Sequence, residues 1–457
     1  MECESDELFN LADALSVRVN SHRDLFQRLI EDMRSGFDRV KSAVDGELLA
    51  EEFARSLRRL WLEVAVESTS RNFRSPPLDE KTTTATGRNV DFGYERDLHP
   101  TYLEDRCRKF FDEPPNGWSS DHVLLSSGQS AMTAVLHTLE DGSLIKSDHD
   151  RRLSFIHFGT YFETAEIFSL FNSLLEPVAC GRDAMEKMDD IDADVCIIEP
   201  VFCDGHFGCV DIPRLIGHHS QNDRHRVYIF DTTLSGTAYS VEKELDRIRA
   251  LAPAAVFRLA SGLKLFQGGL ELSNVGILSV FTAAESAVSA KEIADNIRKI
   301  RTLLGLGLSF ADVAALEAPW FLDRHYADQY QHAIFANNAR LAASIAANNR
   351  LFDGTFHPSL LSDCQALRCA PYCAFRLKPG SPLTYEEIEG TIRAEVQKRE
   401  MLLDSGGSFG FRGHRFEVVR PGDGTEPFLR VALGRRAGWS CDQTIQLICD
   451  LASGNLS

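Results

Sequence analysis

Long apolar runs are absent from this sequence, and its first residues, Met-Glu-Cys-Glu-Ser-Asp-Glu, are acidic. A membrane-spanning helix needs roughly 20 consecutive apolar residues. A signal peptide needs a shorter apolar core behind a basic start. Neither pattern occurs, so we expect no membrane span and a cytoplasmic location.

Basic residues are scarce relative to acidic ones. Lys and Arg number 49 against 67 Asp and Glu, which makes the formal net charge −18. Nucleic-acid binding draws on a basic face that neutralises phosphates, so no nucleic-acid partner is expected. The eleven cysteines lack the spacing typical of a zinc site. We therefore expect buried free thiols and no metal.

The first predicted region, residues 1–90, is a helical N-terminal extension followed by a polar linker or arm. The whole chain has 457 residues, 44% of them hydrophobic, which allows two to four domains of about 100–200 residues. An amphipathic stripe must be covered, and a neighbouring subunit is favoured over a separate partner. The stripe recurs at three- and four-residue steps: Leu25, Phe26, Leu29, Ile30, Met33, Phe37, Val40 and Val44.

Residues 91–310 alternate short β-like runs with helical patterns. This alternation predicts a mostly parallel sheet with helices on both faces. Ligands bind such sheets at the carboxyl ends of the strands, so residues that follow each run are site candidates. The runs are 122–125, 153–157, 195–199, 227–230, 255–259 and 275–280.

Residues 311–457 have a different texture. A helical tract covers about 308–348, and two β-like runs, 374–377 and 428–433, accompany helical patterns near 384–399 and 440–452. We predict a small α+β domain here. The fold class is therefore α/β, with a large domain, a smaller C-terminal domain and a helical extension.

Lys264 and Asp231 are the leading chemical candidates. Lys264 follows an apolar run in Ser-Gly-Leu-Lys-Leu-Phe-Gln-Gly-Gly, and Asp231 ends the run Val-Tyr-Ile-Phe. A lysine held away from water has a lowered pKa and forms an imine with a carbonyl group. A carboxylate at a strand end points into the ligand crevice. Taken singly, each also fits a surface lysine or an Asx-turn.

Two further motifs follow strands. Ser127, Gly128 and Gln129 stand where a run passes into a helical pattern, and Ser261 lies three residues before Lys264. Backbone N–H groups at a helix start bind phosphate, and the Ser261 hydroxyl is placed to assist.

Tyr161 follows the next run, in His-Phe-Gly-Thr-Tyr-Phe-Glu-Thr. Its ring would stack on a flat ligand. His157 and Phe158 are alternatives for that role, and core packing explains an aromatic residue here equally well.

In this order, the motifs resemble fold-type I (aspartate aminotransferase-like) pyridoxal-phosphate enzymes, more narrowly the γ-synthases and γ-lyases of cysteine and methionine metabolism, in divergent form. The resemblance covers about residues 90–457. It implies pyridoxal 5′-phosphate as cofactor, an imine at Lys264 and a ring-nitrogen partner in Asp231. The family loop Tyr-x-Arg-x-x-Asn-Pro-Thr is matched by Tyr94-Glu95-Arg96-Asp97-Leu98-His99-Pro100-Thr101. Tyr94 and Arg96 would then reach the cofactor phosphate of the neighbouring subunit.

The resemblance also implies a substrate clamp. The family's Arg-Leu-Ser-x-Gly strand appears as Arg430-Val431-Ala432-Leu433-Gly434, and Arg412 and Arg415 are rival clamps. A guanidinium holds a carboxylate by two parallel hydrogen bonds. The family's Asn near the cofactor's phenolic oxygen is missing, and Cys203 or Asp204 would replace it.

The predicted activity is deprotonation of an amino acid at Cα by Lys264, followed by elimination or replacement at Cγ or Cβ. Candidate substrates are S-adenosylmethionine, an O-acylhomoserine and a thioether amino acid, and specialised metabolism suits the divergence. A homodimer or homotetramer with shared sites is implied by the resemblance. Two alternatives stay open, an aminotransferase and a non-catalytic cofactor-binding scaffold.

Overall fold

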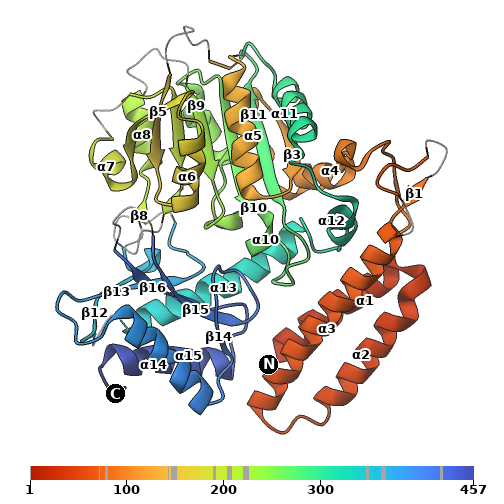
Figure 1. The fold of residues 1–457 in the computed structure, drawn as a ribbon, viewed down its shortest axis with the longest axis vertical. Helices are drawn as coiled ribbons and strands as arrows, with labels where there is room; N and C mark the ends of the chain where they lie inside the picture. The colour runs from red at the N-terminus through yellow and green to blue at the C-terminus, as the bar shows by residue number, and fades with distance from the viewer. Residues whose placement is uncertain are drawn as a thin grey trace.

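The structure is a computed structural model with side chains. It describes residues 2–70, 73–77, 81–142, 144–145, 152–188, 192–202, 208–219, 226–345, 349–361, 367–421 and 426–456. Cys203 and Asp204 lie outside these residues. Figure 1 shows a large α/β layer, a smaller mixed layer below it and a group of long helices beside both.

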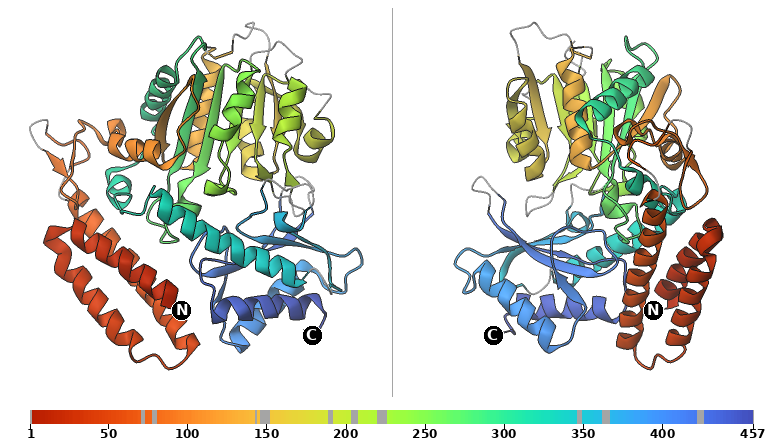
Figure 2. Two further views of the ribbon diagram at one scale, coloured as in Figure 1. Left: turned by 180° about the vertical axis from the view of Figure 1, so that it is seen from behind. Right: turned by 45° about the vertical axis from the view of Figure 1, so that its right-hand side comes forward.

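The N-terminal region consists of α1 (Glu2–Arg18), α2 (Arg23–Phe37) and α3 (Ala43–Ser70), with a short 3₁₀ turn, η1 (Asn20–His22), between the first two. The apolar stripe is covered in part within the chain itself, since Phe26 and Ile30 are buried whereas Leu25 is exposed, and cover by a neighbouring subunit stays a prediction. Its buried residues pack with those of α1 and α3 and against segments 270–272 and 315–320. Figure 2 shows these helices packed side by side.

The large sheet has seven strands in the order β3-β11-β10-β9-β6-β4-β5. Only β11 runs antiparallel to its neighbours, both β10 and β3, so the predicted mostly parallel sheet is confirmed. The order is a doubly wound one, in which consecutive strands are connected by helices. The strands are β3 (Trp118–Leu125), β4 (Leu153–Phe158), β5 (Leu175–Cys180), β6 (Val195–Ile198), β9 (Val227–Asp231), β10 (Ala255–Ser261) and β11 (Gly276–Ala283).

Helices cover both faces of this sheet, so its strands are buried on both sides. Along β6, Val195 and Ile197 pack under one helical layer, and Cys196 and Ile198 pack under the other, as the two-residue period of a strand requires. The first layer is α5 (Gly128–Glu140), α6 (Phe162–Leu170) and α11 (Ala290–Leu304), and the second is α7 (Gly181–Glu186), α8 (Ile212–His219) and α9 (Glu242–Arg249).

The smaller sheet has the order β12-β13-β16-β15-β14, antiparallel except between β14 and β15. The long helix α13 (Arg324–Ile345) runs between the two sheets (Figures 1 and 2). The remaining parts of this region are β12 (Phe352–Phe356), η4 (Pro358–Leu360), β13 (Cys373–Leu377), α14 (Tyr385–Lys398), β14 (Leu403–Ser405), β15 (His414–Val419), β16 (Phe428–Ala432) and α15 (Trp439–Ala452).

Short elements connect these layers. They are β1 (Thr82–Thr83), β2 (Asn89–Val90), η2 (Glu95–Asp97), α4 (Thr101–Phe110), β7 (Val201–Phe202), β8 (Gly208–Cys209), η3 (Gly236–Ala238), α10 (Gly262–Leu265) and α12 (Phe310–Ala315). No helix among the described residues is long and apolar enough to cross a membrane.

The cysteines follow the expectation of buried free thiols only in part. Cys107, Cys196, Cys373 and Cys441 are buried and free, whereas Cys180 is free and exposed. Cys209 is disulfide-bonded, which corrects the expectation. Sequence spacing says nothing about which sulfur atoms the fold brings together.

Candidate active site

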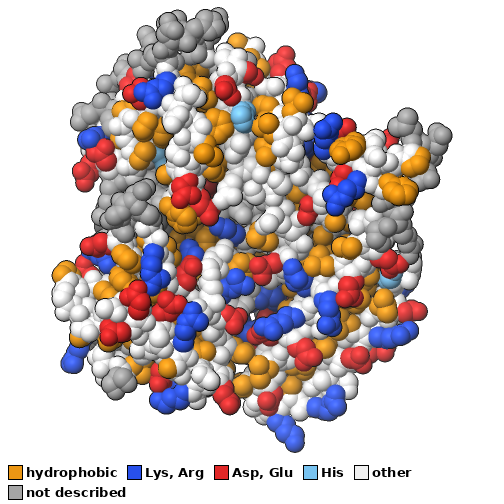
Figure 3. All heavy atoms as spheres, in the orientation of Figure 1, with side chains coloured by type: hydrophobic (Ala, Val, Ile, Leu, Met, Phe, Trp, Pro, Cys, Tyr) orange, Lys and Arg blue, Asp and Glu red, His pale blue; other side chains and the backbone are white. Residues whose placement is uncertain are grey.

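The carboxyl ends of β3, β4, β6, β9 and β10 meet at one edge of the large sheet and form the base of a pocket. The pocket has a volume of about 620 Å³, and residues of the small domain complete it. Figure 3 shows the surface hollowed between the large domain above and the small domain below. Of the residues predicted for the site, those that line the pocket are Ser127, Gly128, Gln129, Tyr161, Asp231, Ser261, Lys264 and Arg430.

Lys264 lies in α10, the single helical turn that follows β10. Its ammonium nitrogen Nζ is 4.6 Å from the ring centroid of Phe409 and 5.6 Å from that of Tyr161. Burial lowers the pKa of Lys264, and the nearby Arg430 lowers it further, against the opposing charges of Asp231 and Glu163. A lysine in this state reaches its neutral, nucleophilic form more readily than a surface lysine.

Asp231 closes β9 and lies beside β10, where its register partner is Leu259. Its Oδ1 accepts a hydrogen bond of 2.9 Å from the backbone N–H of Thr233. Burial and the negative charge of Glu199 raise the pKa of Asp231 to about 6. The charge of Lys264 opposes this rise only in part, and a positively charged ligand atom beside the carboxyl group would oppose it further.

The predicted phosphate turn is built at the start of α5. Ser127 is the N-cap, and its Oγ accepts a 3.0 Å hydrogen bond from the Ser130 N–H. Gly276 opens β11 directly against this turn, since a Cβ there would lie 1.9 Å from the Ser127 carbonyl oxygen. A Cβ atom placed on Gly128 would lie 3.5 Å from the Cβ of Ser261. Helix N–H groups and a serine hydroxyl thus converge, as an anion site requires.

Tyr161 lines the pocket just before α6. Its hydroxyl donates a hydrogen bond to Glu163, which also accepts one from the Gln129 side chain. Burial and Glu163 raise the pKa of Tyr161. The alternatives lie elsewhere: Phe158 is buried in the core, and His157 is hydrogen-bonded to Glu199 at 2.9 Å behind the pocket.

The three candidate clamps separate in the structure. Arg430 lies on β16 inside the pocket, where it pairs with Glu417 across the strands and its Nε has no hydrogen-bond partner among the described residues. Arg412 is buried against α1, 2.9 Å from Glu7. Arg415 lies 3.4 Å from Glu271, over the ring of Phe411. Arg412 and Arg415 do not line the pocket, which places them away from a substrate there.

Tyr94 and Arg96 also lie away from the pocket of their own chain. Tyr94 is half exposed, and the Arg96 guanidinium carbon is 5.0 Å from its ring centroid. The Nε of Arg96 is 3.8 Å from Asp97 Oδ1. The contact of Tyr94 and Arg96 with the phosphate site of a neighbouring subunit stays a prediction.

Sequence reasoning missed pocket residues from both domains. Tyr372, Phe409 and Glu417 of the small domain line the pocket; Glu417 lies in β15 and the other two lie in loops beside strands, and the sequence left the pairing of these strands unassigned. Glu163 was also missed. Its position after β4 offered a signal, since carboxyl ends of neighbouring strands gather polar groups.

No family model matches this chain, and no curated protein matches it. Solved structures do. The methionine gamma-lyase CalE6 from Micromonospora echinospora is 16% identical with a TM-score of 0.57, over 83% of this chain and 93% of that one. Cystathionine gamma-lyase from yeast is 14% identical with a TM-score of 0.56, over 86% and 97% of the two chains.

Cystathionine gamma-synthase from Xanthomonas oryzae pv. oryzae, in complex with aminoacrylate and cysteine, is 15% identical with a TM-score of 0.54. It matches over 86% of this chain and 99% of that one. At these identities the likeness concerns the fold. The chain therefore has the fold of the gamma-lyases and gamma-synthases.

Proposed function

We propose that this protein is a pyridoxal-phosphate enzyme that deprotonates an α-amino acid at Cα and catalyses elimination or replacement at Cγ or Cβ. One observation carries the proposal: a buried lysine, a buried carboxyl group and a helix N-terminus line one pocket. The shared fold supports it.

The residues of the pocket fit the cofactor. Ser127, Gly128, Gln129 and Ser261 would hold its phosphate, and Asp231 would hold its ring nitrogen in the protonated form. The ring of Tyr161 would cover its face. When bound, pyridoxal phosphate supplies an electron sink for the negative charge left by proton removal.

Lys264 has two duties in this proposal. Its ε-amine would hold the cofactor, and as a free neutral amine it would accept the proton from the substrate Cα. The lowered pKa of Lys264 favours the neutral form that both duties need. The Phe409 and Tyr161 rings beside Nζ limit the access of water to it.

Arg430 would bind the substrate carboxylate. Its Nε is a buried donor without a hydrogen bond among the described residues. Glu417 pairs with the Nη2 nitrogen of the same guanidinium. A substrate carboxylate must therefore compete with Glu417 for this arginine. The competition lowers the affinity of the site for simple amino acids.

Substrates in keeping with this chemistry are S-adenosylmethionine, an O-acylhomoserine or a thioether amino acid. Each carries a leaving group on Cγ. We further propose a homodimer or homotetramer in which Tyr94 and Arg96 of one subunit complete the phosphate site of the next, and a place in the cytoplasm.

The test begins with an absorbance spectrum of the purified protein with pyridoxal phosphate, followed by titration with each candidate substrate. The visible band of the lysine-bound cofactor should appear and should respond to one substrate, with release of its leaving group.

Lys264→Ala should abolish the band. Lys291→Ala is the matched control, because that lysine is exposed on α11 and paired only with Asp295. A protein that binds no cofactor would overturn the proposal. Amino transfer to a keto acid without loss of a leaving group would establish an aminotransferase instead.

A further inference from the structure

One loop of the small domain contacts both the candidate catalytic lysine and the N-terminal helices. It covers residues 406–413, between β14 and β15. At one end Phe409, which is buried, lies 4.6 Å from Lys264 Nζ. At the other end Arg412 is buried against α1. The loop therefore connects two regions that are otherwise distant in the sequence.

The loop backbone is fitted closely against α10. Ser408 has a positive φ of 71°, and Gly410 has a φ of 85°. A Cβ on Gly410 would lie 2.2 Å from the carbonyl oxygen of Lys264, so no side chain fits there. The Tyr330 hydroxyl donates a 3.1 Å hydrogen bond to the Gly410 carbonyl oxygen. A shift of this loop would thus move the Phe409 ring relative to the lysine.

Arg412 attaches the loop to α1. Its Nη1 is 2.9 Å from Glu7 Oε1 and donates to the Gly268 carbonyl oxygen at 3.2 Å, while its Nε lies 3.4 Å from Glu4. Glu7 also accepts a 2.8 Å hydrogen bond from the Tyr326 hydroxyl. Arg412 is only 4% exposed, and a buried guanidinium holds its carboxylate partners strongly because water does not replace them.

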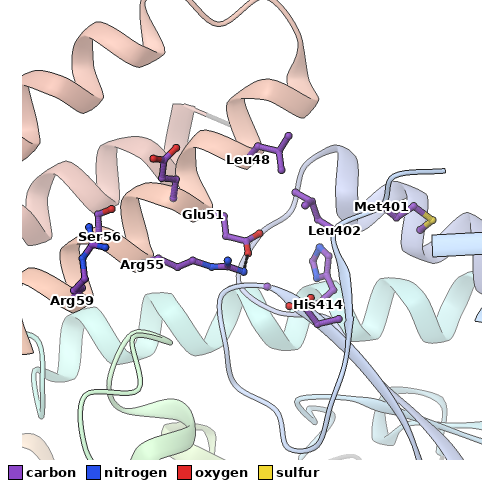
Figure 4. A pocket seen from close by; sticks show the side chains of 11 residues that line it. Leu48, Glu51, Arg55, Ser56, Arg59, Met401, Leu402 and His414 are labelled. Atoms are coloured by element: carbon purple, nitrogen blue, oxygen red, sulfur yellow. Dashed lines mark hydrogen bonds and ion pairs between the residues drawn. The ribbon is translucent and has the colours of Figure 1, made fainter. Parts of the chain in front are cut away.

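The contact between the N-terminal helices and the small domain, called the N-terminal junction below, includes further arginines besides Arg412. Arg436 lies 3.1 Å from Glu4 and 3.5 Å from Glu51, and Arg435 lies 3.0 Å from Glu7. Figure 4 shows α3 facing the small domain, with Glu51 and Arg55 on one side and His414 on the other. The N-terminal helices are therefore bound to the same domain that supplies Phe409.

We propose that α1 is a positioning element of the active site, in which Glu7 acts through Arg412 to hold Phe409 against Lys264. Arg412 and Glu7 do not line the pocket, so they act on the lysine through the loop. The inference rests on the proposed function in one respect, the role of Lys264 as the cofactor lysine.

The charged groups that face Lys264 are Arg430 on β16, Asp231 on β9 and Glu163 at the start of α6. None of them belongs to the loop or to α1. Loosening the loop leaves these charges in place and admits water beside Nζ. Because hydration favours the charged form of an amine, the lysine should then titrate at higher pH.

The experiment compares Glu7→Gln with Asp6→Asn. Both replace a carboxylate on α1 by its amide, but Asp6 is exposed. The first readout is the pH titration of the visible band of the lysine-bound cofactor. The second is the pH dependence of reductive methylation of Lys264 in the cofactor-free protein, followed by mass spectrometry, which needs no cofactor.

Glu7→Gln should move both midpoints upward by about one pH unit, the shift expected when a buried amine gains partial hydration. Asp6→Asn should leave both unchanged. Arg412→Lys, which keeps the charge but loses the two-pronged contact, should reproduce the shift, as should Phe409→Ala. Glu7→Asp should restore part of the wild-type behaviour.

The outcomes separate the two proposals. A wild-type protein without a visible band would sink the proposed function, and the methylation readout would still test the positioning role. If Phe409→Ala shifts the midpoints while folded Glu7→Gln and Arg412→Lys do not, α1 has no part in placing the ring. If either charge variant fails to fold, the other decides the question.

Discussion

The pocket and the N-terminal junction both contain buried arginines and carboxylates, but they use them differently. In the junction, Arg412 is met by two carboxylates and a carbonyl oxygen. In the pocket, Lys264 faces aromatic rings, and burial together with the charge of Glu199 raises the pKa of Asp231 to about 6. Matched charges hold a fold together, whereas a charge left poorly matched is ready to receive a ligand.

The largest expected effect is at Asp231. Asp231→Asn keeps the shape of the side chain but removes its charge, so under the proposed function the cofactor ring nitrogen would lose its acid partner. We expect kcat to fall by about 10²–10³-fold, the usual cost of losing one preorganised electrostatic partner, with the cofactor still bound. Asp105→Asn, an exposed residue paired with Arg108, is the control. Equal activity of both variants would refute the ring-nitrogen role.

The different roles assigned to Arg430 and Arg412 can be tested by measuring both KM and the free energy of unfolding for a variant of each. Arg430→Gln should raise KM for the amino-acid substrate roughly 10- to 100-fold, because a charged hydrogen bond is lost, and should leave the fold intact.

Arg412→Gln should instead lower the free energy of unfolding by about 3–5 kcal/mol, because it leaves buried carboxylates unpaired. Its effect on KM should be smaller than that of Arg430→Gln. Urea denaturation and steady-state kinetics on both variants measure the two quantities. Our assignment would be contradicted if Arg430→Gln lost more stability than Arg412→Gln and Arg412→Gln had the larger rise in KM.

Glu417 gives a smaller and more diagnostic effect. Because it engages one edge of Arg430, Glu417→Gln should free that arginine and lower KM by about fivefold, equivalent to ~1 kcal/mol of ion-pair energy. Steady-state kinetics with one substrate suffices. A rise in KM would mean that Glu417 itself contacts the substrate, for example a cationic group on it.

The junction should also impose a pH dependence on stability. Burial would raise the pKa of Glu7, but Arg412 and Arg435 outweigh it and the net shift is downward from 4.5. The stabilisation is therefore fully present above pH 4.5 and is lost as the pH falls through the lower folded pKa. Denaturation curves from pH 7 to pH 3 should show a shallower acid loss for Glu7→Gln than for wild type.

Much of the fold followed from local pattern. Strands buried on both faces, such as Val227–Asp231 and Ala255–Ser261, appear in the sequence as short apolar runs. Strand β5 did not, because its residues from Glu176 to Val178 are exposed and include a proline. Strand β15 was missed because its buried and partly exposed residues alternate, and it has no apolar run.

The sequence by itself determined the order of the candidate site residues: a Ser-Gly turn, an aromatic residue, a carboxylate and a lysine, each after a strand. Parallel strands bring their carboxyl ends to one edge, so position along the chain was enough to gather them. The tertiary structure alone decided among the arginines. The motif resemblance put Arg430 first and left Arg412 and Arg415 as rivals, and only packing shows that α1 surrounds Arg412 with carboxylates while Arg430 faces the pocket.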